Sequence, residues 1–266
     1  MIYGLHVSKC KFGNIKDALY AYKDEYPSAK LAQIFVLGPQ NSKLVNISED
    51  DIVDIRKLKL DIYVHSSYLT HLFSDTKQIR TSSRLIVKKE LEMADKLHAK
   101  GLVVHINDKA SPQEIVRLLS KIELSDYKTP IYLENMYRTE YIHSFSNLFN
   151  LEHVFSLIDE VPNLKGRVRY CLDTSHLWAQ GFPVDDNNIL YEYLRVIKKY
   201  KPIVHLNDNS NQKGSLKDKH SSIGDGMIWR DSDSYKIVFD SGYPLIFERS
   251  SVSTGNEDIE LAHKYK

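Results

Sequence analysis

Six short apolar segments of this sequence end in a histidine or an acidic residue. The six residues are His65, His105, Glu134, Asp173, His205 and Glu248. Imidazole and carboxylate groups without thiolate form a ligand set for Zn²⁺ or a related divalent ion. One such residue alone is usually a helix cap or a buried hydrogen-bond partner. Six at equivalent places predict a shared metal site, because like charges that converge in a buried pocket require a cation.

Two further pairs add candidate ligands in the segments that follow these runs. In Asp173-x-x-His176, a second imidazole lies one turn beyond the end of its run. In Asp218-x-His220, two groups project to the same side of an extended segment. The complete set of nine residues is too large for one ion and predicts a cluster of two or three.

The apolar segments recur along the whole chain, and most are separated by enough residues for a helix. The eight runs are Ile2–His6, Leu31–Leu37, Ile62–His65, Leu102–His105, Ile131–Glu134, Tyr170–Asp173, Ile203–His205 and Leu245–Glu248. Continuous rather than alternating apolar runs are typical of strands that are buried on both faces of a parallel sheet. The sequence therefore predicts eight parallel strands.

The segments between the runs carry helix signals. Ser111-Pro112-Gln113-Glu114 has the pattern of a capping box with proline at the first helical position. Residues 84–100 have apolar side chains near helical spacing and stop at Gly101, which we interpret as a C-terminal signal. Residues 187–199 form a similar segment before Pro202.

Alternation of strands and helices over 266 residues predicts an α/β fold with one domain, residues 1–266, that forms a (β/α)8 TIM barrel. In such a barrel the carboxyl ends of the strands converge, which places the metal cluster at that face. An open, doubly wound sheet is the alternative, but no glycine-rich phosphate fingerprint follows any of the runs.

The bulk composition limits the classes of partner. A formal net charge of +1 does not indicate nucleic acid, so DNA binding would depend on local Lys/Arg clusters or on bound metal ions. The two cysteines, Cys10 and Cys171, are far apart and suit a reducing compartment. No apolar run approaches the roughly 20 residues that span a bilayer, and the first residues lack the pattern of a signal peptide. We expect a soluble, intracellular protein with no membrane partner.

Six segments resemble the signature blocks of the endonuclease IV family and follow the family's order over nearly the whole chain. The segments are Gly4-Leu5-His6-Val7-Ser8, Val64-His65-Ser66-Ser67-Tyr68-Leu69, Leu133-Glu134-Asn135, Cys171-Leu172-Asp173-Thr174-Ser175-His176, His205-Leu206-Asn207-Asp208 and Lys217-Asp218-Lys219-His220-Ser221-Ser222-Ile223-Gly224-Asp225-Gly226. The Leu-Asp-Thr-x-His and Asp-x-His-x-x-(Ile/Leu)-Gly-x-Gly patterns are the most specific of these blocks.

This resemblance implies three zinc ions, with Mn²⁺ as an alternative at one or more sites. The implied ligands are His65, His105 and Glu134 for the first ion, Glu134, Asp173, His205 and Glu248 for the second, and His176, Asp218 and His220 for the third. All nine ligand positions hold the residue type that the family requires. A degenerate, inactive relative would not be expected to keep the whole set.

The activity that the resemblance implies is hydrolysis of DNA at an abasic site, with possible trimming of 3′ ends. Zinc lowers the pKa of bound water to about 7, which supplies a hydroxide nucleophile at neutral pH. Attack on the phosphate 5′ to the lesion leaves a 3′-hydroxyl and a 5′-deoxyribose phosphate. We expect Glu134, Glu248 and His105 to take part in catalysis.

The resemblance also implies contacts with double-stranded DNA that contains an abasic site. It assigns Tyr68 and Leu69 to these contacts. Separately from the resemblance, we expect contacts from Lys9, Lys43, Lys217 and Lys219, because these lysines fall in segments that follow strand ends, on the face where DNA would lie. In the family, the Tyr-Leu pair presses into the DNA at the lesion. His6, Asn207 and Asp208 are expected to form hydrogen bonds within the site or to orient loops rather than to bind metal.

Three segments depart from the family pattern. Lys9-Cys10-Lys11-Phe12-Gly13 replaces a glycine pair, and Gly38-Pro39-Gln40-Asn41-Ser42-Lys43 lacks the usual arginine and tryptophan residues. Met136-Tyr137-Arg138-Thr139 replaces a glycine-rich stretch. These departures concern DNA affinity and lesion discrimination more than metal chemistry.

Two other functions fit parts of the same pattern. A divalent-metal sugar isomerase or epimerase has this type of barrel but needs fewer ligands and has no use for Asp218 and His220. A protein that binds abasic DNA without cutting it would not need the full ligand set. The family resemblance favours a monomeric enzyme.

Overall fold

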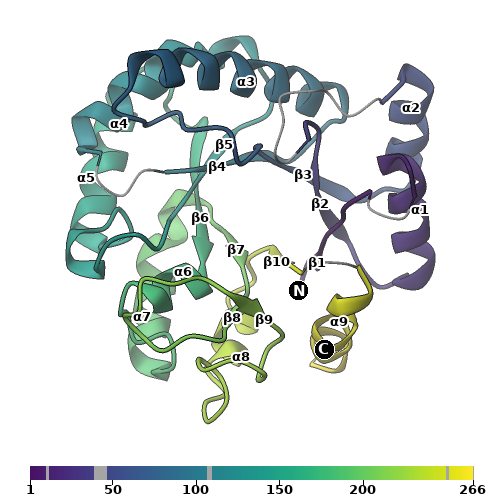
Figure 1. Ribbon diagram of the computed structural model, residues 1–266, viewed down its shortest axis with the longest axis vertical. Coiled ribbons are helices and arrows are strands. Elements are labelled where there is room, and N and C mark those ends of the chain that lie inside the picture. The colour runs from purple at the N-terminus through teal and green to yellow at the C-terminus, as the bar shows by residue number, and fades with distance from the viewer. Residues whose placement is uncertain (10–11, 39–46, 107–109, 250–251, 266) are drawn as a thin grey trace.

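A closed barrel of parallel strands lies at the centre of the structure (Figure 1). The structure is a computed structural model, and it describes residues 1–9, 12–38, 47–106, 110–249 and 252–265. Within these residues, eight strands close in the order β1-β10-β7-β6-β5-β4-β3-β2. Their bounds are β1 Tyr3–His6, β2 Leu31–Phe35, β3 Asp61–His65, β4 Gly101–His105, β5 Ile131–Glu134, β6 Val168–Asp173, β7 Ile203–His205 and β10 Leu245–Phe247. The predicted (β/α)8 barrel is therefore confirmed, and the open sheet is excluded.

Helices surround the strands, as Figure 1 shows. They are α1 Ile15–Glu25, α2 Glu49–Lys57, α3 Lys77–Lys96, α4 Pro112–Leu119, α5 Leu148–Asp159, α6 Thr174–Ala179, α7 Asn187–Ile197, α8 Tyr235–Asp240 and α9 Asn256–Lys264. Side chains start several of them: Asn14 caps α1, Ser48 forms a full capping box on α2, and Ser111 caps α4 before Pro112. In the described segments, no helix combines the length and the hydropathy that a membrane span requires.

Side chains alternate between the two sides of each strand, and this alternation builds two separate apolar regions. One region lies between the barrel and the helices and includes Val64, Val104 and Leu133. The other is a small inner cluster of Leu31, Tyr63, Val103, Tyr132, Cys171, Ile203 and Ile246. Each member of the inner cluster stands two positions before a polar residue of its strand or strand end. The candidate ligands therefore form the next layer inside the barrel, toward the carboxyl ends of the strands from this inner apolar cluster.

One helix-end interpretation from the sequence is wrong. Helix α3 ends at Lys96 rather than at Lys100, and His98, with φ of 55°, takes the left-handed conformation after it. Gly101 is instead the first residue of β4. A Cβ atom at Gly101 would lie 2.2 Å from Cε2 of Tyr132, so glycine leaves room for that ring inside the barrel.

A two-stranded antiparallel sheet follows β7 and was not predicted as such. It pairs β8, Asp208–Asn209, with β9, His220–Ser221. The pairing folds the segment between them back toward the barrel, which carries Asp218 and His220 to the strand ends. The register matches Asn209 with His220.

Candidate metal centre

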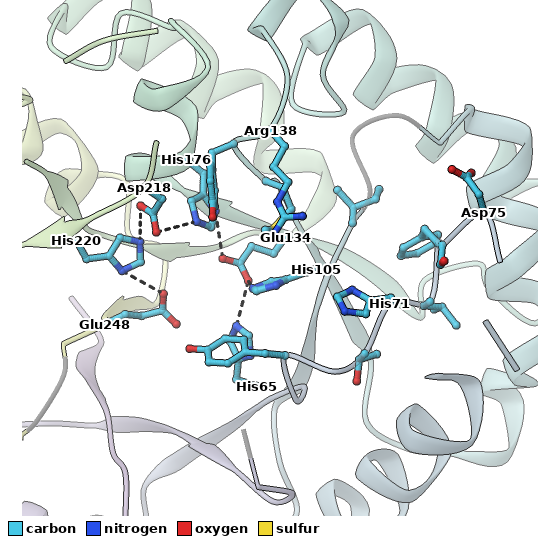
Figure 2. A pocket seen from close by; sticks show the side chains of 18 residues that line it. His65, His71, Asp75, His105, Glu134, Arg138, His176, Asp218, His220 and Glu248 are labelled. Atoms are coloured by element: carbon cyan, nitrogen blue, oxygen red, sulfur yellow. Dashed lines mark ion pairs between the residues drawn. The ribbon is translucent and has the colours of Figure 1, made fainter. Parts of the chain in front are cut away.

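The predicted ligands converge at the carboxyl ends of the barrel strands. A pocket with a volume of about 600 Å³ opens there. Seven of the nine predicted ligands line it: His65, His105, Glu134, His176, Asp218, His220 and Glu248. The other two, Asp173 and His205, have no exposed surface and contact these residues from the barrel interior. Figure 2 shows Glu134 between the histidines of the pocket.

The first group of ligand atoms is built on Glu134. Its Oε2 atom lies 3.3 Å from Nε2 of His65 and 3.2 Å from Nε2 of His105. Strands β3, β4 and β5 are neighbours in the barrel, so their last residues meet at one place. The ligand atoms of these three residues all lie within 4.8 Å of one another, a spacing that suits a shared ion.

A second group lies beside the first and shares Glu134 with it. Nδ1 of His205 is 3.1 Å from Oε1 of Glu134, 3.4 Å from Oε2 of Glu248 and 4.0 Å from Oδ2 of Asp173. These four residues again offer ligand atoms within 4.8 Å of one another. Glu134 therefore presents one carboxylate oxygen to each group, as a bridging ligand would.

A third group contains Asp173, His176 and His220. Asp218 contacts both histidines: its Oδ2 lies 3.6 Å from Nε2 of His176, and its Oδ1 lies 3.1 Å from Nε2 of His220. Asp173 caps helix α6 by accepting the backbone N–H of His176 at 2.8 Å, which fixes the Asp173-x-x-His176 pair. Asp173 belongs to the second and third groups, so shared carboxylates connect all three.

Cys171 lies next to this centre, although the sequence analysis treated the ligand set as free of thiolate. Its sulfur forms a further group with Glu134 and His205. Burial raises the pKa of the Cys171 thiol to about 12, so the sulfur stays protonated and is a poor metal ligand. Imidazole and carboxylate remain the available donors.

Two buried atoms of the centre indicate that these residues suit a bound cation. Within the described part of the chain, Oε2 of Glu134 and Nε2 of His220 have no hydrogen-bond partner. Buried polar atoms are normally satisfied, and an orphaned carboxylate oxygen between two imidazoles is costly. Divalent ions bound in the first and third groups would satisfy these two atoms, and a donor set of nitrogen and oxygen suits zinc.

The ionisation of the centre follows from burial and from the paired charges. Burial opposes ionisation of Glu134, but His205 and His105 outweigh it and hold its pKa well below the usual value. Burial likewise opposes ionisation of Glu248, and His205 lowers that pKa to about 2. Burial raises the pKa of Asp173 despite the opposing effect of His176. Glu134 and Glu248 are therefore anionic near neutral pH and ready to bind a cation.

Comparisons with known proteins agree with this geometry. A model of the family described as the xylose isomerase-like TIM barrel matches residues 31–262. A probable AP endonuclease of African swine fever virus is 31% identical over 219 residues, which cover 78% of this chain and 71% of that protein. The chain belongs to the endonuclease IV family of AP endonucleases.

Two further matches cover 93% and 100% of this endonuclease IV family member. A probable endonuclease 4 of Mycobacterium bovis is 29% identical over 254 residues, covering 93% of this chain and 92% of the relative. The crystal structure of endonuclease IV from Thermus thermophilus superposes with a TM-score of 0.83 at 22% identity, covering 100% of this chain and 98% of that one. The similarity to the Thermus thermophilus structure shows a shared fold.

Amide side chains hold the candidate ligands of this endonuclease IV family member in place. Nδ2 of Asn207 donates to Oδ2 of Asp173 at 2.8 Å. Asn135 accepts the backbone N–H of Asp173 at 2.8 Å through its Oδ1 atom. Asp208 accepts three N–H groups of the 224–228 segment and so orients a loop. Asp208 therefore contacts a loop, whereas Asn207 contacts the side chain of a candidate ligand.

His6 also forms a hydrogen bond within the site, through Gln33. The two side chains approach at 3.1 Å between Nδ1 of His6 and Nε2 of Gln33. Sequence analysis missed Gln33 and assigned no role to Asn135. A lone amide inside the otherwise apolar run Leu31–Leu37 was the signal that could have identified Gln33.

The predicted DNA-contact residues occupy different positions around the pocket. Tyr68 and Leu69 are 51% and 43% exposed, and the Tyr68 ring stacks against His105 at 6.0 Å between centroids. Lys9, Lys217 and Lys219 are exposed and follow β1 or flank Asp218. Lys43 lies outside the described residues. Arg138, in the segment that departs from the family pattern, lines the pocket (Figure 2).

The turn that carries Tyr68 and Leu69 is held from below by a buried acid. Glu90 of α3 accepts hydrogen bonds from Oγ of Ser66 at 2.6 Å and from the backbone N–H of Ser67 at 2.8 Å. The hydroxyl groups of Ser66 and Thr70 are hydrogen-bonded to each other at 2.8 Å. This network fixes the turn next to the candidate ligand His65.

Proposed function

We propose that this chain is a zinc-dependent endonuclease that hydrolyses double-stranded DNA at abasic sites. The cut falls 5′ to the lesion and leaves a 3′-hydroxyl and a 5′-deoxyribose phosphate, with trimming of 3′ ends as a side activity. The observation that carries the proposal is that Glu134 and Asp173 connect three adjoining groups of ligand atoms at an open pocket, with Asp173 buried beneath it. Membership of the endonuclease IV family supports it.

Three ions would be held by the residues of the three groups. His65, His105 and Glu134 hold one; Asp173, His205 and Glu248 join Glu134 for the second; His176, Asp218 and His220 hold the third, with Mn²⁺ as an alternative at one or more positions. Bound zinc supplies Lewis-acid activation of water at neutral pH and neutralises charge on a phosphate. A site that needed one ion would not require the residues of the third group.

The side chains of the pocket have separate tasks in this proposal. Glu134, Glu248 and His105 would take part in catalysis by holding the ions that neutralise the reacting phosphate, with the phosphate in line with the attacking oxygen. Tyr68 and Leu69 stand at the rim, where an abasic gap in the base stack would admit them. Lys9, Lys217 and Lys219 contact backbone phosphates and set the register of the duplex. The chain acts as a monomer inside the cell.

The test is incision of a duplex that carries one reduced abasic-site analogue, with products resolved to the nucleotide. The reduced analogue cannot undergo β-elimination, so a cut 5′ to it with a 3′-hydroxyl product requires phosphodiester hydrolysis. Absence of a cut by protein that contains its zinc would overturn the proposal. Metal content near three per chain in the same preparation would disfavour a sugar isomerase, and turnover would eliminate a protein that only binds the lesion.

Two variants test whether the incision activity belongs to this pocket. Glu248→Ala and His205→Ala should abolish incision and leave the barrel folded, because both side chains belong to the centre rather than to the core. Lys30→Ala provides a matched control, since this exposed residue precedes β2 and lies at the opposite end of the barrel. Wild-type incision by either centre variant would contradict the assignment.

A further inference from the structure

Gln33 is a fully buried amide inside a strand of otherwise apolar residues. It has no exposed surface, and its neighbours in β2 are Ala32 and Ile34. Alternation along the strand turns its side chain to the same side as Leu31, which belongs to the inner cluster of the barrel. The amide therefore reaches the layer that holds the candidate ligands.

The contacts of Gln33 determine which way its amide group faces. The Nε2 atom lies 2.6 Å from Oε1 of Glu248. Only the NH₂ group can face a carboxylate oxygen at that distance, because two oxygens would repel each other. The Oε1 atom of Gln33 then faces Nε2 of His205 at 2.9 Å.

This orientation fixes the tautomer of His205. An amide oxygen is an acceptor only, so Nε2 of His205 carries a hydrogen and donates it. The free electron pair of the ring is then left on Nδ1 when the ring is neutral. Nδ1 is the atom that lies 3.1 Å from Glu134 and 3.4 Å from Glu248, within the second group of ligand atoms.

The same amide acts on two more residues of the site. Its contact with Glu248 engages Oε1 and leaves Oε2 of that carboxylate facing Nδ1 of His205. The second N–H of the amide faces Nδ1 of His6 at 3.1 Å, so that nitrogen accepts and Nε2 of His6 carries the hydrogen. One side chain thus sets the hydrogen positions of two histidines and the rotation of one glutamate.

We propose that Gln33 is a positioning residue that makes His205 offer Nδ1, and Glu248 offer Oε2, to a metal ion in the second group. The proposal rests on the metal-binding part of the proposed function and does not depend on DNA cleavage. Hydrogen-bond partners of this kind orient metal ligands, and their loss typically weakens metal affinity by about 10- to 100-fold.

The first test is the protonation pattern of His205 in the zinc-loaded protein. Proton–nitrogen NMR spectra of protein labelled with ¹⁵N-histidine separate a ring nitrogen that carries hydrogen from one that does not, and a His205→Gln variant assigns the signal. We expect hydrogen on Nε2 and none on Nδ1. Hydrogen on Nδ1 would overturn the proposal, and this measurement needs no change at Gln33.

The second test removes the hydrogen bonds and keeps the volume. Gln33→Met should weaken the tightest zinc binding at the second group by about 10- to 100-fold, measured by competition with a chelator in the absence of DNA. Ile34→Val is the matched control, because Ile34 is buried in the same strand but lies in the outer core. Thermal unfolding of the metal-free variants verifies the fold.

The outcomes separate this proposal from the proposed function. Unchanged zinc affinity in a folded Gln33→Met protein would overturn the role of Gln33, whether or not the wild type cuts DNA. Weakened affinity together with a wild-type protein that does not cut DNA would support the role of Gln33 and refute the endonuclease proposal. Equal losses in Gln33→Met and Ile34→Val would show a general packing effect and would also overturn the role of Gln33.

Discussion

Asn207 connects the ends of separate barrel strands by donating a 2.8 Å hydrogen bond from its Nδ2 atom to Oδ2 of Asp173. Its Oδ1 atom accepts the backbone N–H of Glu248 at 3.0 Å and a guanidinium N–H of Arg249 at 2.8 Å. The amide of Asn207 therefore connects the strand end that carries Asp173 with the one that carries Glu248. The positions of Asp173 and Glu248 depend on each other through it.

The first prediction concerns this amide. Asn207→Ala should lower zinc affinity by about 10- to 100-fold, because Asp173 loses its donor and the Glu248 backbone loses its acceptor. Incision should fall with it. Metal content after dialysis against a zinc buffer gives the measurement, and Asn188→Ala, which changes an exposed residue at the start of α7, is the control. Equal zinc content in both variants would contradict the role of Asn207.

The second prediction concerns removal of metal. The apolar core of the barrel does not involve the ligands, so the metal-free chain should keep its helices and strands. An ion that binds only the folded state stabilises it by about 2.7 kcal/mol when its concentration is 100 times the dissociation constant. We therefore expect a chelator to abolish incision and lower the unfolding temperature, with circular dichroism of the folded state unchanged. An unfolding temperature that does not respond to the chelator would argue against tight metal binding.

A third prediction follows from Glu90, the buried acid beneath the Ser66–Thr70 turn. Burial raises the pKa of its carboxyl from an ordinary 4.5 to about 7, against the opposing hydrogen bonds from Ser66 and Ser67. The folded state then holds a proton that the unfolded chain has released, so stability falls as pH rises from about 4.5 to about 7. The loss is on the order of 3 kcal/mol.

Glu90→Gln should remove this loss, because an amide keeps an oxygen for the Ser67 N–H and never ionises. Relative to wild type, the variant should become progressively more stable as the pH rises from 5 to 8. Urea unfolding of metal-free proteins at several pH values measures the difference, with the exposed Glu92→Gln as control. A difference between Glu90→Gln and wild type that stays constant with pH would refute the prediction.

Much of the centre could be predicted because its residues obey one local rule. A strand alternates its side chains, so a polar residue two positions after an inward apolar one must also face inward, as Glu134 does after Tyr132. Parallel strands then bring such residues to one end of the barrel. Local sequence was sufficient for His65, His105 and Asp173 for this reason.

Other features depend on contacts between distant segments and could not be predicted. Gln33 matters because it meets Glu248 and His205, which lie more than 170 positions away in the sequence. The sequence pattern of Gly101 resembled a helix stop, but this glycine makes space inside the barrel for the ring of Tyr132 on the neighbouring strand. A pattern confined to neighbouring residues contains neither relationship.

The last prediction concerns Arg138 and the affinity for the DNA substrate. Arg138 is the one lysine or arginine among the described residues that line the pocket. It forms no ion pair with a carboxylate of the described residues. Arg138 is exposed, and Figure 2 shows it among the side chains that line this pocket. The Tyr137 ring lies near both groups, with its centroid 6.0 Å from Cζ of Arg138 and 5.0 Å from the His176 ring. We expect this arginine to contact a phosphate next to the scissile one.

Arg138→Gln should therefore weaken binding of an abasic duplex and lower the slope of log affinity against log salt by about 1, because one phosphate contact releases about one counterion. Zinc content should not change, since Arg138 is not a ligand. Lys30→Gln, at the opposite end of the barrel, removes the same charge and should leave both affinity and slope unaltered. The measurement is fluorescence anisotropy over a series of salt concentrations in chelator-free buffer, with a duplex whose phosphate 5′ to the abasic analogue is replaced by a non-hydrolysable linkage. If the slope of Arg138→Gln equals that of wild type, the arginine contacts no phosphate and the lysine-bearing loops must hold the duplex without it.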